Sequence, residues 1–182
     1  MFRVAGQSNA ATLPEAVREY GQVGEFYRTF GRYTDISEAP YNPADTLWGL
    51  ANQTDAQRVG VWAHELQRLI VERYKIPVAV INGAFPGAGI QYLVPNPANP
   101  ADRATPYGRM LYRVQKAGVA GKAKALFWWQ GELDSYRSIP QYPARFDTLY
   151  RAWQRDFPGL QKIYAAQIAI INEPSDNAGA IR

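Results

Sequence analysis

Three polar clusters in the sequence contain side chains that could carry out acyl transfer. The first is GQSN at residues 6–9, where Ser8 directly follows a short apolar stretch. A hydroxyl at a strand-to-helix turn is exposed, and it lies near backbone N–H groups that favour the negative charge developing on an acyl oxygen. Ser8 therefore fits a nucleophile. A serine that only caps a helix or completes a turn is the simpler alternative.

The second cluster is the glycine-rich stretch NGAFPGAG at residues 82–89. Glycines let the backbone approach a substrate closely and direct an N–H group at its oxyanion. We expect Gly87 to be this donor, with Gly83 and Ala88 as weaker candidates, although the stretch could also be a plain tight turn. The spacing of its glycines matches neither the dinucleotide fingerprint nor the phosphate-binding loop, and no lysine follows.

The third cluster is WWQGELDS at residues 128–135. The side-chain amide of Gln130 can donate to the same oxyanion as the backbone N–H groups of Ser8 and Gly87. Glu132 and Asp134 follow within four residues, and both could simply be solvated loop acids. The cluster thus adds one oxyanion donor and two carboxylates to the candidate site.

A nucleophilic serine needs a base, and the sequence contains one histidine, His64. In the amphipathic stretch 55–74, His64 falls off the apolar stripe and near Arg68 on the helical wheel. We therefore expect His64 to be an exposed surface residue in the middle of a helix, away from the loops that carry the polar clusters. This position does not fit a catalytic base.

Apolar stretches that alternate with amphipathic ones would position these clusters. The predicted strands are residues 2–6, 75–83, 123–131 and 160–170, and the predicted helices are 55–74, 107–118 and 142–157. Near-continuous apolar strands separated by helices are typical of a parallel sheet covered on both faces. We predict a three-layer α/β/α sandwich with a parallel, flavodoxin-like sheet. The aromatic-rich segment 20–54 shows few helix or strand signals, so we expect its side chains to pack under a long loop or to line a sugar site.

Each polar cluster directly follows one of the first three predicted strands. In parallel α/β sheets, ligands bind beyond the carboxyl ends of the strands, near a topological switch point. We therefore expect the three clusters to meet at one edge of the sheet, although they are far apart in the sequence.

The three blocks resemble the conserved blocks of the SGNH (GDSL-like) hydrolases, from Phe2 to about Ile171. More specifically, GQSN and the QGE of WWQGELD resemble the sialate O-acetylesterase and carbohydrate acetylesterase branch. The resemblance implies a serine esterase that removes O-acetyl groups from carbohydrates, such as sialate or xylan-type acetyl esters, through an acyl-enzyme. It implies an acetylated carbohydrate as substrate and requires no metal and no cofactor.

The resemblance also assigns roles to individual residues. Ser8 is the nucleophile, its own N–H belongs to the oxyanion hole, and Asn9 completes the first block. Pro86 and Gly87 stand where the family has a pair of glycines, and because proline has no N–H, the donor role passes to Gly87. Gln130 takes the oxyanion role that an asparagine has in the wider superfamily.

The third block carries two supporting acids and one departure from the family pattern. Glu132 belongs to the Gln-Gly-Glu block and is expected to hold the hydrogen bonds of the site, and Asp134 matches an acidic residue two positions later. Many family members have histidine before the glutamine, whereas this sequence has Trp129. Substrate contacts or the position of the base could differ accordingly.

In the family, the base and its orienting acid come as Asp-x-x-His in a C-terminal loop, and this sequence does not contain that motif. It ends with PSDNAGAIR at residues 174–182, where Asp176 or Asn177 could cap a helix. We therefore predict that residues 1–182 form a single, incomplete hydrolase domain, whose last helix, strand and base-bearing loop follow Arg182. A catalytically inactive, glycan-binding relative of the same fold is the alternative.

The composition limits the number of domains, the partners and the chemistry that the chain can have. With 182 residues, 47% of them hydrophobic and 20% charged, the chain can bury the core of one domain. The net charge of +4 comes from basic residues scattered along the sequence, which does not favour a nucleic-acid partner. No apolar run is long enough to span a bilayer. The lack of cysteine excludes disulfides and thiolate catalysis but leaves the compartment open.

Overall fold

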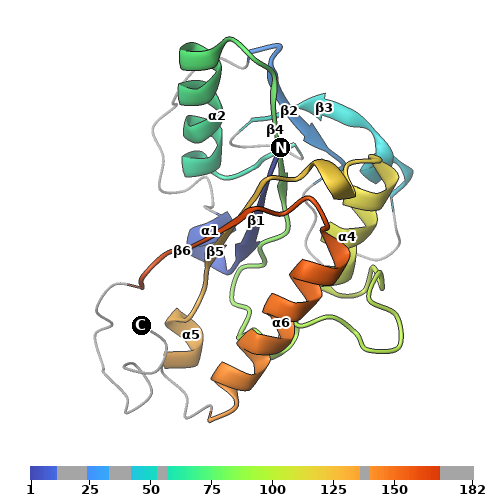
Figure 1. The fold of residues 1–182 in the computed structure, drawn as a ribbon, viewed down its shortest axis with the longest axis vertical. Coiled ribbons are helices and arrows are strands. Elements are labelled where there is room, and N and C mark those ends of the chain that lie inside the picture. Colours follow the sequence, from blue (N-terminus) through green and yellow to red (C-terminus); the bar gives the residue numbers. More distant parts are fainter. Residues whose placement is uncertain (12–23, 33–41, 53–56, 136–139, 169–182) are drawn as a thin grey trace.

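A mostly parallel six-stranded sheet forms the centre of the computed structural model, which describes residues 1–11, 24–32, 42–52, 57–135 and 140–168 (Figure 1). The strands are β1 (Phe2–Gly6), β2 (Tyr27–Phe30), β3 (Trp48–Leu50), β4 (Val78–Asn82), β5 (Ala125–Trp129) and β6 (Lys162–Ala165). Their order is β3-β2-β4-β1-β5-β6, and only β3 runs antiparallel to its neighbour, β2. The predicted α/β class is confirmed.

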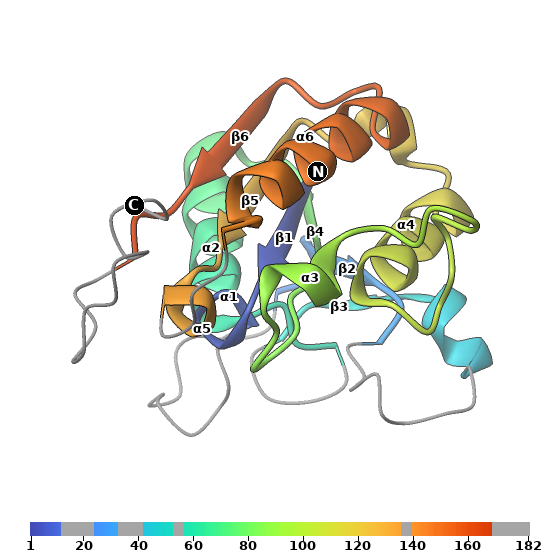
Figure 2. The same ribbon diagram turned by 90° about the horizontal axis from the view of Figure 1, so that it is seen from below.

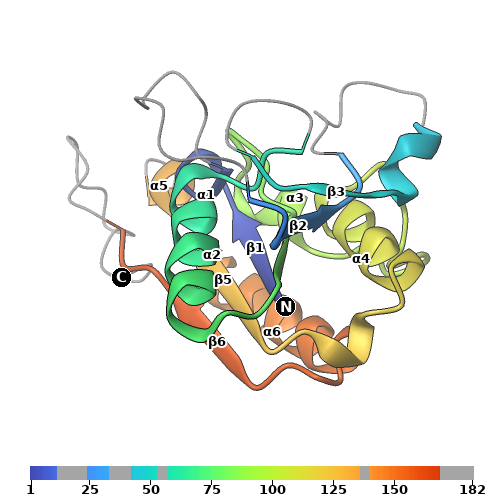
Figure 3. The same ribbon diagram turned by 90° about the horizontal axis from the view of Figure 1, so that it is seen from above.

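Helices cover both faces of this sheet, which gives three layers (Figure 3). The α-helices are α1 (Ser8–Ala11), α2 (Val61–Tyr74), α3 (Ile90–Leu93), α4 (Pro106–Lys116), α5 (Glu132–Ser135) and α6 (Tyr142–Asp156), with 3-10 turns at η2 (Pro43–Thr46) and η3 (Ala120–Lys122). One face lies under α2, and the other lies under α4 and α6. None of the helices in the described ranges has the length and apolar character needed to cross a lipid bilayer.

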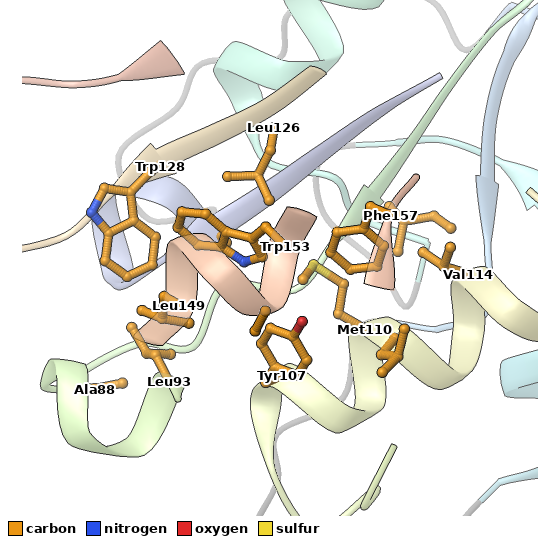
Figure 4. Close-up of a cluster of buried hydrophobic side chains, with 14 of the residues drawn as sticks. Ala88, Leu93, Tyr107, Met110, Val114, Leu126, Trp128, Leu149, Trp153 and Phe157 are labelled. Atoms are coloured by element: carbon orange, nitrogen blue, oxygen red, sulfur yellow. The ribbon is translucent and has the colours of Figure 1, made fainter. Parts of the chain in front are cut away.

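Neighbouring residues of each central strand point into different layers, as the period of a β-strand requires. Val4 and Val80 pack under α2, whereas Ile81 and Leu126 face α4 and α6. The larger of the two cores lies on the α4 and α6 side (Figure 4). In that core, the fully buried indole of Trp153 lies edge-on to Trp128, with ring centroids 5.3 Å apart.

The four predicted strands all form, and they lie in the order second, first, third, fourth. This is the start of the flavodoxin-like order. The elements are shorter than predicted: the helix expected over 55–74 begins only at Val61, after Gly60 with φ of 91°. The strand expected over 160–170 spans Lys162–Ala165, and residues 169–182, including the proposed cap at Asp176 or Asn177, lie outside the described residues.

Two strands lie in the segment that showed few secondary-structure signals. β2 and β3 are four and three residues long and form the outer part of the sheet beyond β4. Their aromatic side chains pair across the strands, because Phe30 lies opposite Trp48 with ring centroids 5.2 Å apart. The expectation of a long loop over this whole segment is therefore wrong. Tyr33 and Tyr41, which belonged to the same expectation, lie outside the described residues.

A buried arginine ties this added hairpin to the rest of the sheet. Arg113 of α4 donates to the carbonyl oxygens of Phe30 (2.7 Å), Asn82 (2.8 Å) and Gly31 (3.3 Å), and so joins the end of β2 to the end of β4. Burial lowers the pKa of Arg113 to about 10, which leaves the guanidinium charged near neutral pH.

Replacing Arg113 by methionine should lower the free energy of unfolding by about 2–4 kcal/mol, because three buried carbonyl groups lose their donor. Arg109→Met, on the same helix, is the matched control: it gives up only surface hydrogen bonds to the carbonyl of Arg103 and should change the free energy of unfolding by less than about 1 kcal/mol. Urea denaturation followed by circular dichroism measures both. Equal midpoints for the two variants would contradict the anchoring role of Arg113.

Candidate active site

The three polar clusters meet at the carboxyl edge of the sheet, around the end of β1. After β1 the chain forms β2, β3 and β4 on one side of β1, and it then crosses to β5 on the other side. The topological switch point therefore lies between β1 and β5. Short helices follow three of the strands here: α1 after β1, α3 after β4 and α5 after β5 (Figure 2).

Backbone contact between the ends of β1 and β5 brings the first and third clusters together. The N–H of Gln7 donates to the carbonyl oxygen of Trp129 at 3.0 Å. Gly6 has φ of 142°, and a Cβ at this position would overlap the same carbonyl group. Only glycine allows the two chains to approach this closely. Ser8, the first residue of α1, is thereby held beside the loop that follows β5.

Two backbone donors at this edge are open to a ligand. No described residue accepts a hydrogen bond from the N–H of Ser8 or of Gly87. Gly87 is exposed, has φ of 70° and has open space where a side chain would lie. Ser8 is half-buried at the start of its helix. Free N–H groups of this kind can stabilise a developing oxyanion.

Gln130 is buried below this edge, with 2% of its surface exposed, and its side chain hydrogen-bonds to several loops. Its Nε2 donates to Asp134 Oδ2, to the carbonyl of Ala88 (3.3 Å) and to Gln7 Oε1 (3.4 Å). Its Oε1 accepts a hydrogen bond from the Tyr142 hydroxyl at 3.0 Å. The amide therefore joins the loops after β1, β4 and β5 to the first residue of α6. Its amide hydrogens are directed at protein acceptors.

Asp134 is fully buried and not a solvated loop acid. Besides the bond from Gln130, its Oδ2 accepts from the N–H of Ile90 at 2.8 Å. Ile90 is the first residue of α3, where a carboxylate also interacts favourably with the exposed N–H groups of the helix end. Asp134 thus fixes the loop after β4 against the loop after β5.

Glu132 makes a second connection, nearer the surface. Its Oε1 accepts from Asn9 Nδ2 at 2.5 Å and from Trp129 Nε1 at 3.0 Å. The carboxylate holds α1 against α5 on the outer side of Ser8. Trp129, which stands where many family members have histidine, therefore contributes an indole N–H to this network.

Sequence reasoning missed two members of the site. Tyr142 was expected only as the start of a helix, yet its hydroxyl reaches Gln130, and burial raises its pKa so that it remains a donor. Gln7 accepts from Gln130 and from the N–H of Leu133 at 3.3 Å. The signal for Gln7 was its place inside the GQSN block. Nothing in the local pattern around Tyr142 distinguishes it from an ordinary core tyrosine.

The expectation that His64 is exposed is wrong. His64 is 2% exposed, and its ring lies edge-on to Tyr27 of β2 with centroids 5.3 Å apart. The helical wheel misplaced it because β2, which the pattern did not predict, covers that flank of α2. β4 separates β2 from β1 in the sheet, and burial lowers the pKa of His64.

Fold and site together define a doubly wound α/β domain with a polar, glycine-lined site at its switch point. The whole chain, residues 1–182, matches the family described as carbohydrate esterase, sialic acid-specific acetylesterase, and it belongs to that family. The resemblance inferred from the three sequence blocks is thereby confirmed. No curated protein matches the chain in sequence.

Two solved structures are similar in fold. A protein from Arabidopsis thaliana shares 19% sequence identity, with a TM-score of 0.65, over 92% of this chain and 73% of its own. A carbohydrate acetylesterase from Xanthomonas citri shares 17% identity, with a TM-score of 0.62, over 91% of this chain and 40% of its own. The chain therefore spans less than half of the Xanthomonas protein.

Gly6→Ala should destabilise the protein by on the order of 3 kcal/mol, because its Cβ would force β1 and β5 apart at the site. Gly121→Ala is the control, since a Cβ there meets open space. Gly121→Ala should change the free energy of unfolding by no more than about 1 kcal/mol. Thermal and urea unfolding of both variants measure the difference. Comparable stabilities would show that the close approach of the two strands is not required.

Asp134→Ala should lower the free energy of unfolding by about 3 kcal/mol, since it leaves the Ile90 N–H and the Gln130 amide without their acceptor. Asp134→Asn should recover part of this loss, because the one amide oxygen can take the place of Oδ2. Asp147→Ala, at an exposed ion pair on α6, should change stability by less than about 1 kcal/mol. Equal urea midpoints for Asp134→Ala and Asp147→Ala would refute the role of Asp134 in holding the loop after β4 against the loop after β5.

Proposed function

We propose that this chain carries the nucleophile and oxyanion donors of a serine esterase that removes O-acetyl groups from carbohydrates through an acyl-enzyme. The observation that supports the proposal best is the position of Ser8. It starts a helix at the switch point, and no described residue engages its own backbone N–H or that of Gly87 in the loop after β4. Membership of the carbohydrate esterase family supports acetyl esters of sugars as substrates.

In the proposed reaction, Ser8 Oγ attacks the acetyl carbonyl while a base takes its proton. The tetrahedral oxyanion forms against the N–H groups of Ser8 and Gly87. Collapse breaks the bond to the sugar oxygen, which takes up the proton, and leaves an acetyl group on Ser8. Water then hydrolyses this acyl-enzyme and releases acetate. No step requires a metal or a cofactor.

Gln130 is proposed as the third oxyanion donor. In the structure, one of its hydrogen bonds reaches the Ala88 carbonyl at the long distance of 3.3 Å. An oxyanion would take the place of the Ala88 carbonyl as the acceptor of this hydrogen, while the second amide hydrogen stays on Asp134. Asn9, Glu132 and Asp134 support the site by fixing the loops around Ser8, and none of them reacts with the substrate.

The proton acceptor is proposed to be a histidine outside these 182 residues. The single histidine of the sequence, His64, is buried against Tyr27 on the β2 side of α2. In a serine esterase, the base must reach the nucleophile within hydrogen-bond distance. The substrate is proposed to be a sialate or xylan-type acetyl ester.

The isolated chain should therefore hydrolyse 4-nitrophenyl acetate only slightly above buffer. Added imidazole can act as the base, and it should raise the turnover by roughly tenfold or more in the wild type but not in Ser8→Ala. Subtracting the Ser8→Ala rate removes the direct reaction of imidazole with the ester. Thr148→Ala, at an exposed position of α6, should behave like the wild type.

An equal increase in turnover with imidazole in the wild type and in Ser8→Ala would rule out Ser8 as the nucleophile. It would favour the inactive, glycan-binding alternative. Full turnover without imidazole that is lost in Ser8→Ala and kept in His64→Ala would show that no external histidine is needed. Loss of that turnover in His64→Ala as well would make His64 the base.

A further inference from the structure

The side-chain amide of Gln130 can serve an oxyanion in only one orientation. Its Nε2 end has the hydrogens, whereas its Oε1 end would repel a negative charge. In the structure, Nε2 faces three acceptors, which are Asp134 Oδ2, the Ala88 carbonyl and Gln7 Oε1. The last torsion of a glutamine side chain is soft, so the amide plane turns easily unless both of its ends are held. The oxygen end of the amide therefore needs a donor of its own.

The hydroxyl of Tyr142 is that donor. It lies 3.0 Å from Gln130 Oε1 and 3.4 Å from the backbone carbonyl oxygen of the same residue. Within the described part of the chain, no other group donates to this Oε1. Tyr142 is buried, and burial raises the pKa of its hydroxyl, so the donor keeps its proton at neutral pH. Loss of this hydroxyl would leave the buried oxygen end of the amide without a partner.

Packing at the start of α6 fixes the place of this hydroxyl. Tyr142 is the first residue of α6, and Pro143 follows it in the first turn, where a proline ring limits the backbone torsions. The ring of Tyr142 belongs to the larger apolar core, which also contains Trp128 and Leu149 (Figure 4). The hydroxyl therefore reaches Gln130 from a helix end that is fixed through both its backbone and its side chain.

The same helix end is also connected to the other side of the amide. α6 packs against α3, and Arg145 of α6 donates to Gln91 Oε1 of α3 at 3.4 Å. The first residue of α3, Ile90, donates its N–H to Asp134 Oδ2 at 2.8 Å. Asp134 in turn accepts a hydrogen bond from Gln130 Nε2. The two ends of the amide are thus held by groups whose own positions depend on one another.

We propose that Tyr142 is a positioning residue for the oxyanion donor Gln130. Its hydroxyl fixes Oε1, so that Nε2 keeps one hydrogen on Asp134 and directs the other to the place where an oxyanion replaces the Ala88 carbonyl. Donation to Oε1 also polarises the amide and strengthens its N–H groups as donors. The inference rests on the proposed function, because it assigns the support of a donor that acts in that reaction.

Tyr142→Phe removes the hydroxyl and keeps the ring. It should lower kcat for the imidazole-assisted, Ser8-dependent hydrolysis of 4-nitrophenyl acetate by about five- to tenfold and change KM by less than about twofold, because the oxyanion forms only in the transition state. Tyr107→Phe is the matched control, since Tyr107 is also buried and its hydroxyl donates to Asp156 at the other end of α6. This control should lose stability but keep kcat and KM within about twofold of the wild type.

A second measurement follows the amide directly and needs no turnover. NMR signals of the Gln130 side-chain hydrogens are identified by their absence in Gln130→Met. In Tyr142→Phe these hydrogens should exchange with solvent about tenfold faster than in the wild type, because the amide is then free to turn. In Tyr107→Phe they should exchange as slowly as in the wild type, which separates a local effect from a general loss of stability.

Four results decide the proposal. An unchanged kcat in Tyr142→Phe, an equal fall of kcat in Tyr107→Phe, or unchanged exchange of the Gln130 hydrogens in Tyr142→Phe would overturn it. Faster exchange in Tyr142→Phe, in a protein whose Ser8→Ala variant shows the same imidazole response as the wild type, would keep the hold of Tyr142 on the amide and reject the esterase mechanism.

Discussion

The close approach of β1 and β5 at Gly6 is the constraint on which the site depends. Because Gly6 has no side chain, the N–H of Gln7 can reach the carbonyl of Trp129, and the loops after both strands lie in direct contact. Ser8 then begins its helix at the switch point, and Gln130 enters the same small volume from the other strand. Without this contact, the two polar clusters would remain separate features of one sheet edge.

Around that contact, buried polar groups position the loops and the apolar core supports them. Gln130 and Asp134 are both shielded from water, and each side chain has acceptors or donors from different loops. Burying such groups is costly unless they are hydrogen-bonded, so the hydrogen bonds that Gln130 and Asp134 Oδ2 make to several loops favour one arrangement of those loops over others. This arrangement keeps the N–H groups of Ser8 and Gly87 at the surface.

Local patterns in the sequence predicted much of the architecture. Near-continuous apolar strands predicted the central sheet, and the position of polar clusters after those strands predicted the edge that carries the candidate site. β2 and β3 escaped prediction, because a strand of three or four residues gains its stability from its neighbours and from Arg113 rather than from its own pattern. The error over His64 has the same cause, since its burial depends on β2. The role of Tyr142 depends on how α6 docks, which no sequence period encodes.

The first turn of α6 takes part in two networks at once. The Tyr142 hydroxyl donates to Gln130, and Arg145, three residues later, donates to Gln91 of α3. Loss of order in this turn would therefore release the Gln130 amide and the Gln91 side chain together. The packing of one helix end against α3 therefore also helps to position the buried Gln130 amide.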